Sequence, residues 1–346
     1  MMKIPLYDQK NIPRNPSPHS NFGLWYDKFA NQWFNNGDRL KLEFNKVEWI
    51  QGAESFSFEE KESIREFLWR RIRMVQGLGG QFWVFETQSP LVVGLGRTHP
   101  VENGMTWDYI SGLPYIPGSS IKGALKASNE QYFKTYHFID QIAVLDAIPL
   151  FPPALRGEVM TPHYGSYYQN AQTPGDWFEP NPIPFLTVAP GQRFLFSVIA
   201  PREWHADVEK WIERTLIWMG LGAKTAVAFG RFERIKAEEQ RLHGQLDLLV
   251  QEERRERQRQ SLNPLEQELW TDGYYDNPDR FMQAMTQKWL EKMEEPSLPL
   301  SDRVLLAQKL KDWYITNKPQ EWKKPNKKNQ IKIARIMKVL KVLKEE

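Results

Sequence analysis

Residues 193–235 read RFLFSVIAPREWHADVEKWIERTLIWMGLGAKTAVAFGRFERI, and this stretch decides the fold. Apolar and polar residues alternate from Arg193 to Ile199, which predicts a strand. A helix is predicted from Ala206 to Met219, and a glycine-rich loop followed by a strand from Gly220 to Ile235. The apolar face of the helix consists of Val208, Trp211, Ile212, Thr215, Leu216 and Met219.

Residues upstream of this stretch predict the remaining strands and helix of the same domain. Phe82 to Phe85 and Leu91 to Val93 are aromatic or β-branched runs that predict two strands joined by a turn. Ser119 to Phe133 predicts a helix, because serine is a good N-cap and an interior glycine costs only about 1 kcal/mol. This is the β-α-β-β-α-β order of a ferredoxin-like (RRM-type) domain, so we predict an α+β fold of that type, with insertions, over residues 80–235.

One insertion is rich in proline and aromatic residues and runs from Asp146 to Pro190. Its composition predicts an ordered excursion that is neither a helix nor a regular sheet. Its aromatic side chains either stack on nucleic-acid bases or simply pack in the core. They include Tyr164, Tyr167, Tyr168 and Trp177.

Residues 1–79 are predicted to form an N-terminal arm and helices that pack on the core. Pro13 to His19 is rich in proline, serine and asparagine, and aromatic residues then recur at roughly helical spacing from Asn21 to Phe34. This pattern predicts a docked arm that leads into a helix. Lys61 to Val75 predicts an amphipathic helix that ends at Gly77.

Residues 236–346 are predicted to form a separate helical extension, because the composition changes beyond Lys236. Lys318 to Glu346 has ten Lys or Arg against three Glu, a local charge of +7, which predicts a basic tail helix. Ile331 to Leu343 also carries an apolar face, so one interpretation is a membrane-surface helix. Contact of this helix with RNA or protein is favoured over contact with a membrane, because the helix has no acylation signal or aromatic anchor.

The overall composition excludes several classes of protein. Of 346 residues, 41% are hydrophobic and 26% are charged, as in ordinary globular proteins. The net charge of +3 is too small for a uniformly basic protein, so any polyanion site must be a local patch. The chain has no cysteine, which excludes disulfides, Fe–S clusters, Cys-ligated zinc and thiol nucleophiles, and predicts a cytoplasmic location.

We expect neither membrane contact nor a cofactor. No run reaches about 18 apolar residues, and the first residues lack the apolar run of a signal peptide, which predicts a soluble protein not exported by that route. The six histidines are scattered without paired spacing, so no metal site is predicted.

The first candidate phosphate site is PYIPGSSIKGALK at residues 114–126. A glycine, two serines and two lysines one turn apart at a helix start are how an anion site on a helix N-terminus is built. The alternative is an ordinary serine N-cap with solvated lysines. The candidate anion-binding residues here are Ser119, Ser120, Lys122 and Lys126, and the family resemblance described below implies that the anion is RNA.

The second candidate is GLGAKTAVAFGRF at residues 220–232. It resembles a P-loop, but the two glycine positions that a P-loop requires hold Ala223 and Trp218, so ATP binding is not expected. A backbone nest that holds an RNA phosphate remains open, beside the alternative of a helix C-cap and turn. The candidate RNA-binding residues are Gly222, Lys224, Thr225, Gly230 and Arg231.

The third candidate is GLGRTHP at residues 94–100, with Arg97 and His99 as further RNA-binding candidates. In an RNA-cleaving site, His99 would move protons and Arg97 would stabilise the anion. Most single loop histidines have no such role.

These motifs together resemble the RAMP proteins of CRISPR systems. PYIPGSSIKGAL and GLGAKTAVAFGRF recur in this order in that superfamily, and further features resemble RAMP subunits of the type III-B Cmr effector complex. These features are NFGLWYDKF, GLGRTHPVENG, LDAIP, VMTPHY and PGDWFEPNPIPFL. The resemblance covers residues 21–235 and does not extend to the C-terminal region.

The resemblance implies a non-catalytic backbone subunit in antiviral defence that binds CRISPR RNA near its 3′ part. Its implied partners are target RNA, other RAMP subunits and the small helical subunit of the complex. The glycine-rich loop would lie against the RNA backbone. Two residues depart from the family pattern: Ala228 replaces a glycine, which costs backbone freedom, and Glu158 replaces an Asp.

Two enzymatic hypotheses are alternatives to a non-catalytic backbone subunit. One is a metal-independent endoribonuclease that processes CRISPR RNA with His99 as the acid–base residue. The other cleaves target RNA through an acidic residue near a divalent metal, for which Asp108 and Glu102 are the nearby carboxylates.

Overall fold

The computed structural model divides the chain into two compact units, Met1–Gly244 and Gln245–Glu346, which are described separately as unit 1 and unit 2. None of the helices that the structure describes is long and apolar enough to cross a membrane. The described residues are 16, 20–31, 33–35, 42–58, 62–133, 138–162, 173 and 182–342.

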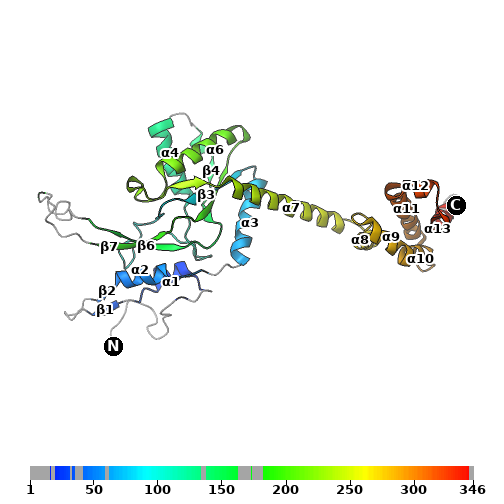
Figure 1. Ribbon diagram of the computed structural model, residues 1–346, viewed down its shortest axis with the longest axis horizontal. Helices are drawn as coiled ribbons and strands as arrows, with labels where there is room; N and C mark the ends of the chain where they lie inside the picture. The colour runs from blue at the N-terminus through cyan, green and yellow to red at the C-terminus, as the bar shows by residue number, and fades with distance from the viewer. Residues whose placement is uncertain are drawn as a thin grey trace. The chain divides into compact units, whose positions relative to one another are not determined.

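Unit 1 is built around an antiparallel sheet (Figure 1). The strand order is β4-β8-β3-β9, and β5 also pairs with β8. Strands β3 and β8 form the long central pair, in which Val84 lies opposite Leu195. A sheet of this kind with helices confirms the predicted α+β class. The strands are β3 (Gln81–Thr87), β4 (Ala143–Val144), β5 (Ile148–Pro149), β8 (Arg193–Ile199) and β9 (Phe232–Arg234).

Helices α4 (Gly118–Ser128) and α6 (His205–Arg214) lie next to each other beside the sheet (Figure 1). Each continues as a π-helix, α4 into η1 (Asn129–Phe133) and α6 into η4 (Thr215–Met219). The indole Nε1 of Trp211 donates to the Leu125 carbonyl at 3.1 Å and to Ser128 Oγ at 3.0 Å, which fixes the two helices together. The helix predicted over 206–219 is therefore confirmed.

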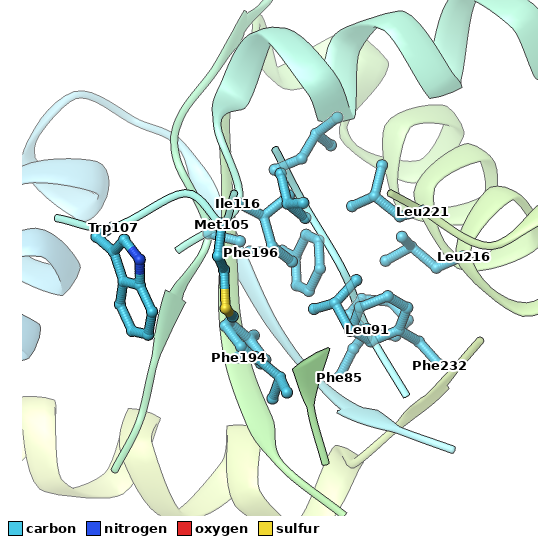
Figure 2. Packing of buried hydrophobic residues seen from close by; sticks show 14 of the residues in the cluster. Phe85, Leu91, Met105, Trp107, Ile116, Phe194, Phe196, Leu216, Leu221 and Phe232 are labelled. Carbon is cyan, nitrogen blue, oxygen red and sulfur yellow. The ribbon is translucent and has the colours of Figure 1, made fainter. Parts of the chain in front are cut away.

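The core of unit 1 consists of buried aromatic and aliphatic side chains from the sheet, from α4 and α6, from the N-terminal helices and from the segments between these elements; Figure 2 shows part of it. The Phe196 ring packs edge-on against Phe85 and Phe232, with centroids 5.3 Å and 5.5 Å apart. Leu216 and Leu221 are buried in the same core. The start of the glycine-rich loop is thus anchored in the core.

The N-terminal elements confirm one predicted helix and shorten another. Helix α3 (Glu62–Gly77) buries the predicted apolar face and ends where predicted. The helix predicted from Asn21 to Phe34 ends at Lys28, because Trp33 and Phe34 pair in a two-stranded sheet. Aromatic residues favour strands when a pairing partner is present. The elements are α1 (Phe22–Lys28), β1 (Trp33–Asn35), β2 (Leu42–Phe44) and α2 (Lys46–Glu54).

The prediction that residues 146–190 contain no regular sheet is wrong. Strands β6 (Leu155–Met160) and β7 (Ile183–Val188) form an antiparallel pair with six registered residues on each strand. Pro184 is tolerated because a two-stranded sheet leaves one edge of each strand unpaired. The predicted base-stacking residues Tyr164, Tyr167, Tyr168 and Trp177 lie outside the described residues.

The strand predicted at Leu91 to Val93 is also wrong. Leu91 makes only an isolated bridge to Val188, while the Val92 carbonyl accepts from Ala223 and the Val93 carbonyl accepts from Thr106. The segment is extended, but its hydrogen bonds go to three different parts of the chain. No ladder forms for that reason.

Helix α7 (Lys236–Gln260) begins at the predicted boundary of the extension, and the two units divide within it. Unit 2 has its own buried core, which includes Trp289, Trp313 and Tyr314. Its helices are α8 (Pro264–Thr271), α9 (Pro278–Ala284), the π-helix η6 (Met285–Trp289), α10 (Leu290–Glu294), α11 (Leu300–Asn317), α12 (Pro319–Lys323) and α13 (Lys327–Val342).

Candidate nucleic-acid interface

The glycine-rich loop, residues 220–231, connects the end of η4 to β9 and lies on the extended segment at residues 90–93. Its backbone is fixed by hydrogen bonds from Ala223 N–H to the Val92 carbonyl and from Gly230 N–H to the Pro90 carbonyl, both 2.9 Å long. A third bond of 2.9 Å, from Leu221 N–H to the Gly230 carbonyl, closes its base. The loop is therefore a rigid platform.

Two glycines of this loop are required by close contact with the chain's own backbone. Gly222 has φ +94°, and a Cβ there would lie 2.5 Å from the Val92 carbonyl oxygen. Gly230 has φ +66°, and its Cβ would lie 1.8 Å from the Leu221 carbonyl oxygen. These two predicted RNA-binding residues thus shape the loop rather than offering a backbone surface to a phosphate.

The middle of the loop presents Lys224 and Thr225. Lys224 adopts the left-handed conformation, with φ +63°, and precedes a short 3₁₀ helix, η5 (Thr225–Val227). Its Nζ lies 5.5 Å from the centre of the Phe185 ring on β7, a cation–π contact. Ala228 also has a positive φ, +68°, so the residue that replaces the family's glycine keeps a conformation that glycine favours.

Arg231 braces the loop from inside. Its backbone N–H donates to Ser89 Oγ at 2.9 Å, and its guanidinium donates to the carbonyl oxygens of Trp218 and Thr225. Part of the Arg231 guanidinium, which was predicted to bind RNA, is therefore already hydrogen-bonded to carbonyl oxygens of the chain. Arg231 still adds positive charge beside Lys224.

Apolar side chains are exposed at the same loop, and the sequence analysis missed them as site residues. Trp218 is 76% exposed and Val227 is 65% exposed. The available signal was the position of Trp218, which falls outside the apolar face of the preceding helix. Exposed indole side chains are typical of surfaces that stack on a flat partner. We call Trp218, Lys224, Thr225, Val227 and Arg231 the loop surface.

The first turn of α4 differs from the predicted anion site. The N-cap is Pro117, and the first helical N–H, that of Gly118, donates to Asp146 Oδ1 at 2.7 Å. The predicted serine N-cap is therefore wrong, and a carboxylate of the chain itself occupies the position expected for a phosphate. A phosphate there would be repelled by Asp146.

The polar residues of this motif are not all free for a ligand. Lys122 is half-buried, and its Nζ donates to the Ile142 carbonyl at 3.0 Å. Ser119 and Lys126 are exposed, and Ser120 is half-buried. Among the described residues, no hydrogen bond or ion pair joins these residues to the loop surface. The helices that carry the two motifs meet where Ser128 Oγ of α4 lies 2.8 Å from Thr215 Oγ1 of η4.

His99 is buried, with 7% of its surface exposed, which argues against both its predicted contact with RNA and the alternative in which it is an acid–base residue. Its Nε2 lies 2.9 Å from the Tyr26 carbonyl oxygen, and its Nδ1 accepts from Val101 N–H at 3.2 Å. The imidazole also stacks on the Tyr26 ring, with centroids 4.5 Å apart. Burial lowers the pKa of His99, so the neutral ring joins this loop to α1.

The remaining residues of the third motif also have local partners. Asp108 accepts from Ser111 N–H at 3.0 Å and from its hydroxyl at 2.6 Å, and Glu102 forms an ion pair with Lys46. Among the described residues, no group of three His, Asp or Glu side chains is placed to hold a metal ion. Arg97 is exposed.

Comparison of the whole sequence with known proteins identifies the family that this domain resembles. Residues 84–233 match the model of the RAMP superfamily, which confirms the predicted resemblance over that stretch. Two curated relatives are named Cmr6, in line with the predicted resemblance to the sixth RAMP subunit of a type III-B Cmr complex. "CRISPR system Cmr subunit Cmr6" of Pyrococcus furiosus is 29% identical, and "CRISPR system CMR subunit Cmr6" of Saccharolobus solfataricus is 33% identical.

These similarities are partial. The matched stretches cover 42% and 40% of this chain, and they span 66% and 50% of the lengths of the two relatives. A chain in "Cryo-EM structure of the Type III-B Cmr-beta bound to cognate target RNA" is 22% identical, with a TM-score of 0.45 over 55% of this chain and 71% of that chain. "Crystal structure of Cmr6 from Pyrococcus furiosus" is 26% identical, with a TM-score of 0.31 over 45% of this chain and 97% of that one.

Proposed function

We propose that this chain is a non-catalytic backbone subunit of a cytoplasmic type III-B CRISPR effector complex and binds CRISPR RNA near its 3′ part. Its proposed partners are target RNA, neighbouring RAMP subunits and the small helical subunit. The observation that carries the proposal is the loop surface, in which the exposed Trp218 and the half-buried Lys224 lie in and beside a hydrogen-bonded loop of a domain similar to Cmr6.

The loop surface suits an RNA backbone for physical reasons. Most of its peptide N–H groups are bonded to the chain itself, so binding orders little additional backbone. Lys224 and Arg231 supply charge for phosphates, and Trp218 supplies a flat face for a base. None of these contacts reads sequence, as a subunit that carries many different guides requires. Exposed Ser119, Lys126 and Arg97 are further proposed contacts.

We further propose that unit 1 has the ferredoxin-like arrangement of RRM-type domains. The elements in question follow the chain order β3, α4, β4, β8, α6, β9, and the sheet order β4-β8-β3-β9 places the first and third strands in the centre. Every pair in that path is antiparallel.

The proposal of a non-catalytic role is supported by the placement of the candidate catalytic groups. His99 is buried with both ring nitrogens engaged, and Glu102 and Asp108 have local partners. An acid–base residue must reach the proton that it transfers.

The test is a gel-shift and cleavage assay of the full-length protein with labelled CRISPR RNA and target RNA, with and without Mg²⁺. Trp218→Ala combined with Lys224→Ala should weaken CRISPR RNA binding roughly ten-fold, because a stacking contact and a phosphate contact are lost. The matched control is Lys210→Ala, an exposed lysine on α6, which should bind as the wild type does. Unchanged binding by the double variant, or cleavage that persists in purified wild type, would reject the proposal.

A further inference from the structure

Unit 2 concentrates positive charge in its last two helices. Residues 318–342 contain nine Lys or Arg and a single acidic residue, Glu321. The rest of unit 2 mixes both signs, and several of its lysines are paired. Lys288 lies 2.8 Å from Glu268, and Lys309 lies 2.7 Å from Glu266. The excess charge is thus a local feature of α12 and α13.

Some of these basic side chains have partners inside unit 2. Arg335 pairs with Glu294 at 2.6 Å, and Lys332 donates to Thr286 at 2.7 Å. Four neighbouring lysines differ: they are exposed, and none forms an ion pair with a carboxylate of the described residues. We call these four the lysine patch; they are Lys323, Lys324, Lys327 and Lys328.

The backbone that carries the lysine patch is fixed. Asn326 Oδ1 accepts from Asn329 N–H at 2.9 Å, which closes the start of α13. The Asn329 side chain in turn accepts from the buried Tyr314 hydroxyl at 3.3 Å, and the Trp322 ring lies 5.8 Å from the Tyr314 ring. The patch is therefore held in place before any partner binds, which reduces the entropic cost of binding.

The like charges of this region repel one another. The four lysines of the lysine patch fall within six residues, 323–328, and Glu321 is the single carboxylate of residues 318–342. Clustered like charge destabilises the folded state unless a counter-charge offsets it. The cluster therefore favours an anionic partner.

We propose that the lysine patch binds the phosphate backbone of a nucleic acid as a second contact, separate from the loop surface. Binding to a membrane is disfavoured because the apolar face of α13 packs in the core of unit 2, where Ile336 and Val339 are buried. A protein partner is disfavoured because lysine is depleted in the cores of protein interfaces. Lysine is a flexible point charge suited to phosphate. Contacts to phosphate alone carry no sequence information, so we expect these four lysines to bind RNA and DNA alike.

The experiment compares full-length variants that lose the same formal charge from unit 2. The patch variant carries Lys→Gln at 323, 324, 327 and 328, and the control carries Arg→Gln at 254, 255, 257 and 259, all exposed on α7 among acidic residues. Affinity for a 30-nucleotide mixed-sequence RNA and for a DNA of equal length is measured from 50 to 300 mM salt. We expect the patch variant to lose roughly ten-fold or more in affinity for both, with a salt slope shallower by about 3, while the control stays within about two-fold.

Equal losses in the two variants would mean that only net charge matters, and no loss in the patch variant would mean that the patch does not bind; either result overturns the proposal. A patch variant that loses binding to phosphatidylserine vesicles but keeps RNA affinity would assign the surface to lipid instead. Acetylation of wild-type lysines, read by mass spectrometry, gives an answer even if a variant misfolds, because bound RNA should protect the four patch lysines.

The loop variant of the previous section separates this inference from the proposed function. Loss of RNA binding in the patch variant alone would leave the inference standing and reject the loop surface, and the reverse result would do the opposite.

Discussion

The first turn of α4 and the glycine-rich loop both combine glycine with lysine, yet they present opposite chemistry to a ligand. In α4 the first helical N–H bonds to Asp146, and Lys122 bonds to a backbone carbonyl. In the loop most peptide N–H groups also bond within the chain, while Trp218 just before the loop is exposed and Lys224 is half-buried. A glycine–lysine motif thus offers a ligand mainly those side chains that are not already bonded to the chain's own backbone.

The difference follows from what each glycine approaches. At Gly118, an added Cβ would lie 2.3 Å from the Val144 carbonyl oxygen, so the glycine lets α4 sit against β4. At Gly222 and Gly230 the close neighbours are the carbonyl oxygens of residues 92 and 221. All three glycines are therefore packing residues, and the proposed RNA contacts come from side chains, Lys126 in the first motif and Lys224 in the second.

The largest effect is expected for Gly230→Ala. The new Cβ would overlap the Leu221 carbonyl at a positive φ, so we expect a loss of about 3 kcal/mol in the free energy of unfolding, measured by thermal and denaturant unfolding. The matched control is Gly123→Ala, where no atom lies within 4 Å of an added Cβ; it should stabilise α4 by about 1 kcal/mol. A Gly230→Ala protein as stable as the wild type would mean that the loop is not a fixed platform.

The next effect concerns the cap of α4. Asp146→Ala removes the acceptor for Gly118 N–H and should cost about 1 to 2 kcal/mol in the free energy of unfolding. Asp146→Asn keeps an acceptor and should recover most of that loss. Ser119→Ala should change stability by less than about 0.5 kcal/mol, since Ser119 is not the N-cap. If Ser119→Ala proved the more costly change, the assignment of the cap would be reversed.

Local patterns predicted those parts of unit 1 whose structure depends on neighbours in sequence. The apolar periods of α6 and α3 were sufficient, because one face of each helix meets the core. The strand β8 was found as well, although residues 194–198 are all buried and the predicted alternation of its faces is absent. The two glycine motifs were found in the same way. Their geometry depends on long-range contacts, and those were not predictable.

Each wrong prediction involves a partner distant along the chain. The acceptor for the first N–H of α4 is Asp146, 28 residues from Gly118. The Nε2 of His99 lies next to the carbonyl of Tyr26, 73 residues away. The β6–β7 pair joins strands across a stretch in which proline obscured the alternation. Trp218 was missed for a related reason: a helical period identifies the buried face, but it does not distinguish an exposed indole with a binding role from one without.

The smallest effect tests whether the loop keeps a glycine-like conformation where the family's glycine is replaced. Ala228 has φ +68°, a conformation that costs an L-residue about 1 to 2 kcal/mol, so Ala228→Gly should relieve strain that exceeds the entropy glycine loses on folding. We expect a net gain of about 0.5 kcal/mol. Ala226→Gly, in the 3₁₀ helix two residues earlier and outside the positive-φ residues, should lose about 0.5 to 1 kcal/mol. Opposite signs in matched thermal unfolding curves would establish that the platform retains the glycine geometry under an alanine; the same sign for both would mean that the loop relaxes and that Ala228 carries no strain.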